Sequence, residues 1–443
     1  MNGGISSLPD PYSNNANGEL NMKERSSFGA GVLRTALIGL IVCLFSCSVA
    51  SRTQSNCSWA AHAEASFIEP SGATADKRPG YVGDQSCSPC HQEKAASFGY
   101  TSHHLTSQLP GPASILGSFK EGENVLMIRD PASKDVDPRL SFKMDIEHGD
   151  YYQTAVAEQA PRKMSRSERI DIVTGSGVRG QTYPYWRENA LFELPVSYWT
   201  DGDQWVNSPG YKDGTANFAR HVDARCLERH ATYIRSLSTD FEANIYDRSS
   251  LVVGISCETC HGPGAAHVER ERAASSKTKK SKDAAILNPA KFTPERQIEL
   301  CGLCHSGGQR AELSPAFTYC PGAPLDQFFG PDAAEASDRP DVHGNQVSML
   351  KKSRCYRSSP SMSCSTCHDV HVKERKAADY SERCLSCHRW QSCGASHRLG
   401  ARIARNCIDC HMPMQQTDAI VSTTAGRNLR TSIRTHWIKI YPG

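Results

Sequence analysis

The chain has 443 residues, of which 38% are hydrophobic, 19 are cysteine and 17 are histidine. This length suits two or three domains and excludes a small scaffold held together by disulfides. The 50 basic and 47 acidic residues nearly cancel, so the charge does not indicate a nucleic-acid-binding protein. Only one long apolar run is present, near residues 35–45, which excludes a protein with many membrane spans.

The first fifty residues have the features of an export signal. Met22 is followed by basic residues, by an apolar run from Thr35 to Phe45 and by the small residues Ser48 to Ala50. A positive start, an apolar centre and a small-residue cleavage site define such signals. We therefore predict a signal peptide over residues 1–50, with Met22 as the candidate true start. The protein would be periplasmic or otherwise exported, and anchored in the membrane if the segment is not cleaved.

Residues 51–80 are expected to be a linker, and the segment from about 110 to 220 is expected to be rich in β-strands. Short runs of β-forming residues lie between turn residues at 125–128, 140–144 and 151–156. Such runs, bounded by glycine, proline and serine, are typical of short strands.

One pentapeptide pattern, Cys-x-x-Cys-His, occurs six times. Two cysteines three residues apart lie on one side of a helical turn, so both can form thioethers with the vinyl groups of one haem. The next residue, histidine, is then carried under the iron as the proximal ligand. A zinc site would use two Cys-x-x-Cys arms and would not require histidine at the next position every time. The pattern therefore predicts six covalently attached haem c groups.

The predicted attachment residues are Cys87, Cys90, Cys257, Cys260, Cys301, Cys304, Cys364, Cys367, Cys384, Cys387, Cys407 and Cys410. The predicted proximal ligands are His91, His261, His305, His368, His388 and His411. Five of the six motifs follow residue 251, which is too dense for independent domains. We expect a mainly α and irregular multihaem fold, with short helices around stacked haems and a β-rich insertion at about 110–220. An N-terminal domain (81–250) would hold the first haem, and a C-terminal domain (251–443) would hold five.

The eleven other histidines are enough to give every iron a second axial ligand. His371 follows His368 by three residues and cannot reach the opposite face of the same iron, so it would ligate a neighbouring haem. Such cross-ligation would draw the haems into a chain. Met412 and Met414 are alternative ligands near the last motif, but histidine is abundant enough to make them unnecessary.

Two further segments depart from the pattern. Cys226-Leu227-Glu228-Arg229-His230 has arginine in place of the second cysteine. It would either hold a seventh haem through one thioether or be a lost site, and we expect the lost site. Cys393 precedes His397 by the same four residues, but His397 is better used as a distal ligand.

Several segments outside the pentapeptides carry a family resemblance. They are Gly80 to Gly83, Ser102 to His104, Cys257 to His267, Asp341 to Asn345, Cys367 to His371, Asn406 to Pro413 and Arg434 to His436. In these segments the chain resembles the multihaem c-type cytochromes of the cytochrome c-554-like class, over most of residues 80–440. The resemblance implies distal ligands at His103 or His104, His267, His343, His371, His397 and His436. It also implies that relatives carry a complete motif where Arg229 stands here.

The sequence favours an electron carrier over a catalyst, and no catalytic residue is predicted. Closely spaced haems with two histidine ligands each would pass electrons in a respiratory or redox chain and leave no iron open to a substrate. The alternative is an oxidoreductase that acts on a small nitrogen or sulfur compound at one open haem, either the first or one at His230. Expected partners are redox proteins, such as a quinol-oxidising membrane complex or other cytochromes. No nucleic acid is expected, and the membrane would be contacted only through an uncleaved N-terminal segment.

Overall fold

The structure is a computed structural model that describes residues 78–128, 139–159, 162–211, 215–274, 285–307, 310–331, 340, 344–373, 376–424 and 426–441. The predicted signal peptide, most of the predicted linker and His343 lie outside the described residues. All described residues belong to one compact unit, Asn56–Gly443. No helix within the described ranges is both long and apolar enough to cross a membrane.

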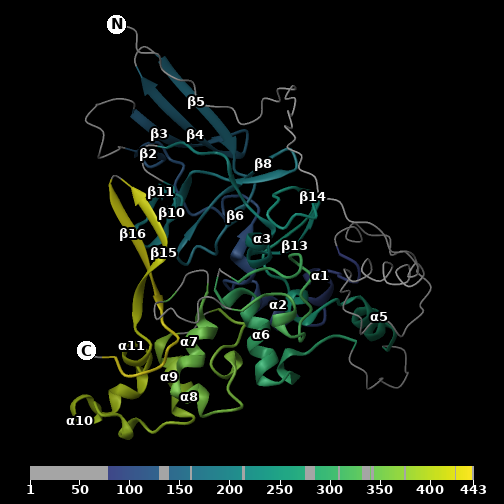
Figure 1. Ribbon diagram of the computed structural model, residues 1–443, viewed down its shortest axis with the longest axis vertical. Coiled ribbons are helices and arrows are strands. Elements are labelled where there is room, and N and C mark those ends of the chain that lie inside the picture. The colour runs from purple at the N-terminus through teal and green to yellow at the C-terminus, as the bar shows by residue number, and fades with distance from the viewer. Residues whose placement is uncertain are drawn as a thin grey trace, which may run out of the picture. The chain divides into compact units, whose positions relative to one another are not determined.

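Antiparallel strands gather at one end of this unit (Figure 1). The largest sheet has the order β2-β3-β4-β5 and is built from consecutive strands. Its strands are β2 (Val125–Ile128), β3 (Arg139–Glu147), β4 (Asp150–Gln159) and β5 (Arg162–Arg169). The strands that follow this sheet in the chain form two three-stranded sheets, in the orders β11-β10-β7 and β12-β9-β8. They contain β7 (Gly180–Gln181), β8 (Pro184–Arg187), β9 (Ala190–Glu193), β10 (Val196–Trp199), β11 (Gln204–Asn207) and β12 (Arg220–His221).

The β3–β4 hairpin illustrates how the sequence sets this part of the fold. His148 and Gly149 form its two-residue loop, and both have positive φ, 53° and 92°. A two-residue hairpin turn of this kind requires positive φ at both positions, which glycine adopts without strain. Along β4, Tyr151, Gln153 and Ala155 are buried while the residues between them are partly exposed. This period of two directs one face of the sheet onto a large aromatic and aliphatic core.

Three pairs of strands connect this region to the rest of the unit. They are β1 (Ser107–Gln108) with β6 (Val173–Thr174), β13 (Ala231–Ser236) with β14 (Tyr246–Val253), and β15 (Met414–Thr424) with β16 (Arg427–Arg434). The β15–β16 hairpin reaches back from the last motif, and the Gly210 N–H donates to the Val421 carbonyl at 3.2 Å. The C-terminal part of the chain is thereby tied to the strand-rich part.

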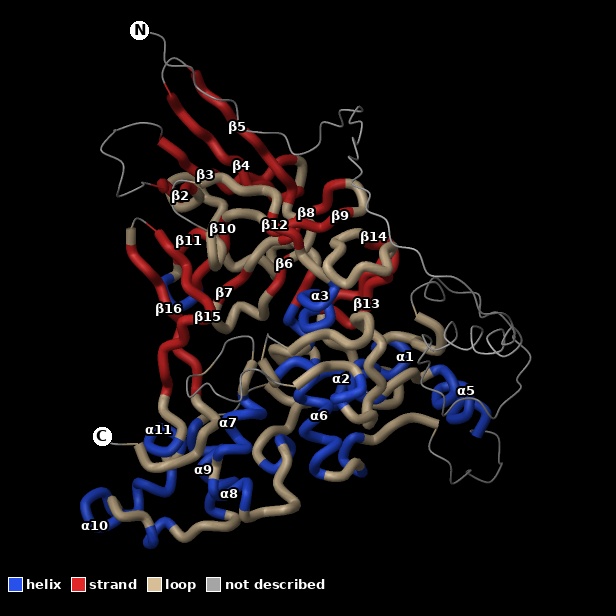
Figure 2. The backbone as a smooth tube through the Cα atoms, viewed as in Figure 1, coloured by secondary structure: helices blue, strands red, loops and turns tan. Residues whose placement is uncertain are grey.

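The motif-bearing part of the chain is made of short helices and loops (Figure 2). Its α-helices are α1 (Asp84–Cys87), α2 (Gln92–Phe98), α3 (Ala224–His230), α4 (Cys257–His261), α5 (Ala265–Ala274), α6 (Pro294–His305), α7 (Gln346–Lys352), α8 (Arg354–Arg357), α9 (Ala377–Leu385), α10 (Ser396–Leu399) and α11 (Ile408–His411). Its 3₁₀ segments include η2 (His104–Thr106), η7 (Cys364–Thr366), η8 (Trp390–Ser392) and η9 (Gly400–Arg405).

The expectation of a mainly α fold is wrong. The described residues contain six sheets, and strands continue well beyond the expected β-rich segment, in β13–β14 and β15–β16. The physical reason is that a haem-attachment motif needs only about one helical turn: α4 has five residues, α11 has four, and the fourth motif lies largely in a 3₁₀ turn. A high density of motifs therefore does not imply long helices.

Candidate haem-binding cavity

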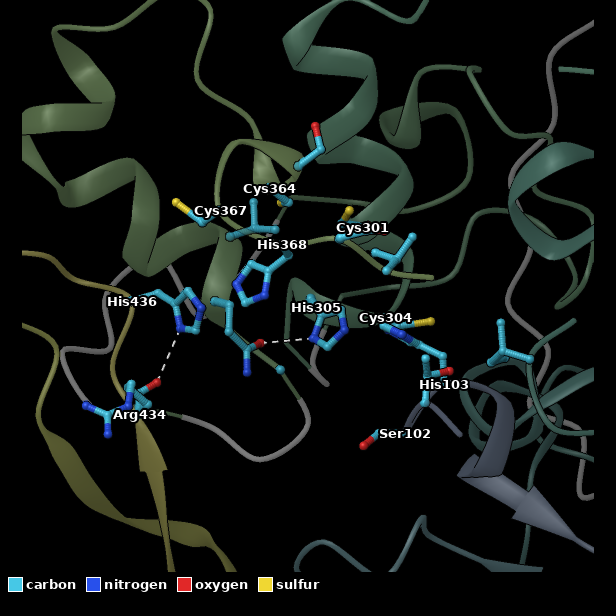
Figure 3. A pocket seen from close by; sticks show the side chains of 18 of the residues that line it. Ser102, His103, Cys301, Cys304, His305, Cys364, Cys367, His368, Arg434 and His436 are labelled. Atoms are coloured by element: carbon cyan, nitrogen blue, oxygen red, sulfur yellow. Dashed lines mark hydrogen bonds between the residues drawn. The ribbon is translucent and has the colours of Figure 1, made fainter. Parts of the chain in front are cut away.

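Residues of all six motifs line one continuous cavity of ≈ 4080 Å³. A pocket for a small ligand or cofactor is usually about 300–1,000 Å³, so this cavity has room for several large groups. Figure 3 shows its central part, where Cys301, Cys304, Cys364 and Cys367 lie around the rings of His305 and His368. The donor set is the one that covalent haem attachment requires, with thiols for the vinyl groups and imidazoles for iron.

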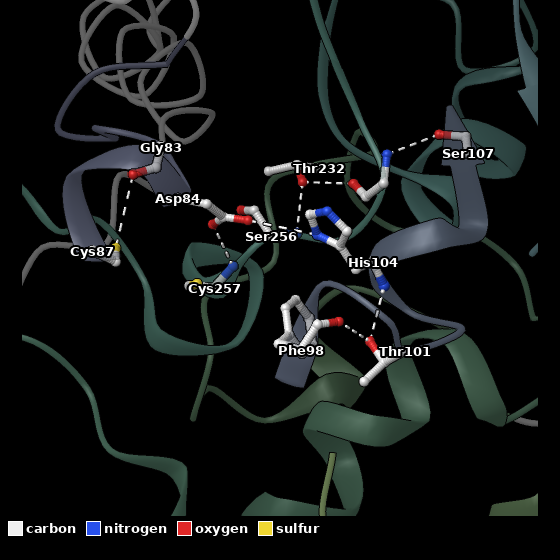
Figure 4. A network of polar contacts seen from close by, with 11 residues as sticks. Gly83, Asp84, Cys87, Phe98, Thr101, His104, Ser107, Thr232, Ser256 and Cys257 are labelled. Carbon is white, nitrogen blue, oxygen red and sulfur yellow. Dashed lines mark hydrogen bonds and ion pairs between the residues drawn. The ribbon is translucent and has the colours of Figure 1, made fainter. Parts of the chain in front are cut away.

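The first and second motifs are joined by the carboxylates of Glu258 and Asp84, and Figure 4 shows the contact between Asp84 and Cys257. Glu258, the second residue of the second motif, accepts backbone hydrogen bonds from Val82 at 3.0 Å and Gly83 at 2.8 Å. In the other direction, the Cys257 N–H donates to Asp84 Oδ1 at 2.9 Å. Burial raises the pKa of Glu258, and its backbone donors partly oppose that rise. Glu258 in the second motif and Asp84, three residues before the first, thus satisfy backbone donors of each other's segments.

The remaining motifs are joined in the same pairwise way. Gln297 on α6, the helix of the third motif, accepts hydrogen bonds from Ser363 at 2.8 Å and Ser365 at 2.6 Å, beside and within the fourth motif. Ser381 on α9, the helix of the fifth motif, accepts from the Cys407 N–H of the sixth at 2.9 Å. Three pairs of motifs are therefore held in fixed register by polar contacts between their own elements.

Neighbouring cysteines connect these pairs into one series. Side-chain hydrogen bonds join Cys87 to Cys257 and Cys301 to Cys364. These contacts lower the pKa of Cys87 and Cys364 and raise the pKa of Cys257 and Cys301. The remaining neighbours lie close enough for the charge of one thiolate to raise the pKa of the other: Cys260 with Cys304, Cys367 with Cys387, and Cys384 with Cys407. The six motifs therefore follow one another in space in the order in which they occur in the chain.

Four of the predicted proximal histidines face a second histidine ring across the cavity. The distances between ring centres fall in a narrow range, from 6.1 to 6.3 Å. The pairs are His91 with His267, His261 with His371, His305 with His103, and His368 with His436. In each pair the second ring comes from a segment outside the first ring's motif.

This spacing fits an iron between the two rings. A metal–imidazole bond is about 2 Å long and the ring centre lies about 1.1 Å behind the nitrogen, so two opposed imidazoles have centres about 6.3 Å apart. Aromatic pairs without a metal have ring centres about 4.5–7 Å apart, so it is the recurrence of this spacing at four motif histidines, and not the distance alone, that favours iron. The residues present therefore fit haem iron with two histidine ligands at these four positions.

Hydrogen bonds at Nδ1 orient several of these rings. Backbone carbonyls lie 2.9 Å from Nδ1 of His261 and His411, at Leu287 and Lys439 respectively. The His305 Nδ1 lies 3.2 Å from Gln346 Oε1. A ring held at Nδ1 presents Nε2 on its other side, which is how proteins commonly orient a metal-binding histidine.

Burial keeps two of the rings neutral. It lowers the pKa of His305 and of His436 to about 4, with nearby positive groups adding to the effect. A neutral imidazole has the free lone pair that a metal needs, whereas an imidazolium has none. The cavity thus holds these side chains in the protonation state that binds iron.

The structure separates two adjacent histidines that the sequence left as alternatives. His103 lines the cavity and faces His305. His104 does not line it; its ring packs edge-on against Phe98, and its Nδ1 lies 3.8 Å from Asp84.

The fifth and sixth motifs have no opposing histidine among the described residues. His388 and His411 both line the cavity. His397 on α10 is exposed and lies outside the cavity lining, so the structure does not bring it to either ring. His343, the remaining sequence-based candidate, is outside the described residues. His148 lies in the exposed turn between β3 and β4, where its role is in the backbone of the turn.

Comparison with known proteins gives one family match and one similar solved structure. A family model described as "Cytochrome c554 and c-prime" matches residues 204–262, which include α3 and the second motif. Among solved structures, the crystal structure of the outer cell wall cytochrome OcwA is similar over 81% of this chain and 80% of its own, at 16% identity and a TM-score of 0.47. No curated protein matches the chain. The family match covers residues 204–262 and, together with the repeated motif, supports a c-type cytochrome that binds haem c covalently and transfers electrons.

Proposed function

We propose that this cytochrome is exported and conducts electrons through six haems arranged in the order of their motifs. The observation that carries the proposal is the set of four opposed histidine pairs, combined with the unbroken series of neighbouring motifs. Each bound haem supplies an iron that accepts and releases one electron. The protein's part is to fix the spacing of these groups and to enclose them.

In this proposal the twelve motif cysteines form thioethers and the six motif histidines are proximal ligands. His267, His371, His103 and His436 are the distal ligands of the first four irons, in motif order. Because two of these distal histidines come from segments next to other motifs, ligation itself ties neighbouring haems together. His343 is proposed for one of the two remaining irons.

The opposed rings favour a carrier over a catalyst at the first four positions. A substrate needs an open coordination position and nearby groups that exchange protons with it. At the four pairs, a histidine ring stands on each side of the space where the iron would lie. The enzyme alternative therefore has support only at positions without an opposed histidine.

Exposure of the attachment residues suggests where electrons enter and leave. Cys90 of the first motif, Cys387 of the fifth and Cys410 of the sixth are exposed. In the middle of the series, the attachment cysteines of the second, third and fourth motifs are only partly exposed. Haems at the two ends would therefore be reached by partners, while those in the middle would be insulated.

A basic surface surrounds the fifth and sixth motifs, and we propose that it docks an acidic redox protein. Five exposed arginines lie within and beside α9, α10 and η9, and none forms an ion pair with another described residue. They are Arg383, Arg389, Arg398, Arg402 and Arg405. Positive charge concentrated at an exposed redox group attracts a partner of opposite charge and speeds its association.

Low-temperature EPR of the oxidised protein, combined with intact mass, tests the proposal. We expect covalently bound haem at all six motifs and low-spin iron at no fewer than four of them. High-spin iron at any of the first four positions would overturn the conducting chain at that position. High-spin iron confined to the fifth or sixth position would support an open haem and hence the enzyme alternative. Detection of the mature N-terminus after residue 50 in an extracytoplasmic fraction would support export.

A further inference from the structure

The large cavity extends beyond the six motifs into the space between α3 and the strand-rich region. Its wall here includes Cys226 and His230 from α3, with Val178, Glu193, Trp199 and Arg220 from the strands and their loops. None of the six motif pentapeptides supplies these residues. This part of the cavity is therefore lined by residues other than those that attach the six predicted haems.

Helix α3 presents a cysteine and a histidine with the same spacing as a complete motif. In the six motifs the first cysteine precedes the histidine by four residues, as Cys226 precedes His230. Asp223 caps the helix by accepting a hydrogen bond from the Cys226 N–H at 2.8 Å. Leu227 and Glu228 are buried, so the helix cannot turn about its axis. Both Cys226 and His230 are thereby held on the cavity side.

The His230 ring is held in the same manner as the motif histidines. Its Nδ1 lies 2.9 Å from Thr106 Oγ1, comparable with the contacts at Nδ1 of His261 and His411. A hydrogen bond at Nδ1 sets the orientation of the opposite side of the ring, where a metal would bind. The Ser107 hydroxyl also donates to the His230 carbonyl, at 2.5 Å, so side chain and backbone are fixed together.

Arg229, at the position of the missing second cysteine, is used to fasten α3 to the third motif. Its guanidinium donates to the Gly307 carbonyl at 2.5 Å, just after His305. Arg225, one turn earlier, donates to the Leu303 carbonyl at 2.6 Å. The arginine that replaces cysteine thus has a structural role of its own, and α3 is placed directly beside the third motif.

We propose that Cys226 and His230 bind a seventh haem through a single thioether. The Cys226 thiol adds across one vinyl C=C bond: a carbon–sulfur bond forms, the vinyl π bond breaks and the thiol hydrogen moves to the other vinyl carbon. The second vinyl group remains intact because Arg229 has no thiol to add. His230 binds the iron. The addition needs no oxidant or reductant, and the proposal does not depend on the order of electron transfer among the other six.

The chain contains a matched control for this assignment. Cys393 precedes His397 by the same four residues, but His397 is exposed and lies outside the cavity lining. Spacing alone would treat the two segments alike, and both cysteines line the cavity, but only the Cys226 segment also brings its histidine, His230, to the cavity wall. Whether Cys226 and Cys393 each carry haem or a free thiol tests this assignment.

The test is peptide mapping of the purified holoprotein after denaturation and alkylation of free thiols. We expect seven covalent haems by intact mass, a haem-bearing peptide that contains Cys226, and an alkylated Cys393. Six haems with an alkylated Cys226 would overturn the proposal. This count is independent of whether the protein carries electrons or reacts with a substrate, so failure here and failure of the proposed function are distinguishable.

Two variants sharpen the result. Cys226→Ser should lower the covalent count from seven to six, and a seventh haem retained by His230 would then be extractable with acidified acetone. Arg229→Cys completes the motif; the count should stay at seven, while the reduced pyridine haemochrome band shifts because the remaining vinyl group is consumed. A count that rises from six to seven in Arg229→Cys would show that the natural site is empty and would overturn the proposal. If Cys226→Ser fails to fold, the mapping of the natural protein still decides.

Discussion

Glu258 accepts a hydrogen bond from the Gly83 N–H at 2.8 Å, although one residue lies inside the second motif and the other just before the first. The same carboxylate accepts from Val82 and from Gly264, also at 2.8 Å in the latter case. One buried side chain therefore satisfies three backbone donors and sets the position of the first motif against the second.

Replacement of Glu258 should destabilise both motifs. In Glu258→Ala the three backbone donors lose their acceptor, and each buried donor left unpaired costs about 1–3 kcal/mol. We expect a lower unfolding midpoint and incomplete haem attachment at the first two motifs, measured by peptide mapping. Glu258→Gln keeps an acceptor oxygen and should have a smaller effect. The exposed Glu269→Gln on α5 serves as control, and equal losses in the alanine and control variants would contradict the role of the carboxylate.

His103 and His104 are adjacent in sequence but differ in the iron spectrum that their loss should produce. His103 faces His305 across 6.1 Å, so His103→Ala should convert the third iron from low spin to high spin. His104 lies outside the cavity lining, so His104→Ala should leave the EPR spectrum unchanged. A high-spin signal in the His104 variant, with none in the His103 variant, would reverse the ligand assignment.

The angle between the two histidine rings at the third motif differs from the angles at the other three motifs that have opposed rings. The His103 and His305 rings are perpendicular, at 90°, whereas the other three pairs are inclined by 22° to 34°. Perpendicular imidazoles leave two of the iron d orbitals nearly equal in energy, so the low-spin ferric signal becomes more anisotropic. We expect one strongly anisotropic EPR signal that disappears in His103→Ala. Its persistence in that variant would assign it to another iron.

The covalent chemistry could be predicted from the sequence because it depends on local spacing. Cys-x-x-Cys-His is complete within five residues, so its interpretation needs no knowledge of the fold. Which distal histidine serves which iron could not be predicted so fully, because opposed rings such as those of His103 and His305 come from distant segments. Local sequence also could not distinguish His103 from His104, whose roles depend on which side of η2 faces the cavity.

The fold class could not be predicted for a related reason. Strands at 125–128 and around 151–156 are visible in the sequence because they are short runs of β-forming residues between turn residues. The hairpin of β15 and β16 is not visible in the sequence, because its strands are polar and because they pair across a register shift between Gln416 and Val421. Helical content was expected from the number of motifs, but each motif folds only about one turn.

Charge reversal at the basic surface should weaken electron transfer to an acidic partner. Arg389→Glu combined with Arg398→Glu removes two positive charges beside the exposed fifth motif and adds two negative ones. We expect slower bimolecular reduction of a negatively charged redox protein at low ionic strength, and little difference at high salt, where surface charges are screened. Stopped-flow kinetics over a range of salt would measure this. Lys120→Glu, an exposed change in the strand-rich region, should leave the rate unaltered; equal slowing there would contradict local docking.

The Glu193 carboxylate on β9 should make stability depend on pH. Burial raises its pKa from an ordinary value near 4.5 to about 7, although Arg220, at 3.3 Å, opposes the rise. Because the folded pKa is the higher one, the contribution to stability is complete below about pH 4.5 and is lost as pH rises through about 7. Glu193→Gln abolishes this titration. Between pH 5 and pH 8, the variant should therefore gain up to about 3 kcal/mol relative to the natural protein. Urea unfolding at both pH values measures the difference, and the exposed Glu242→Gln serves as control. Parallel pH profiles for all three proteins would show that the Glu193 carboxylate is not held in its neutral form.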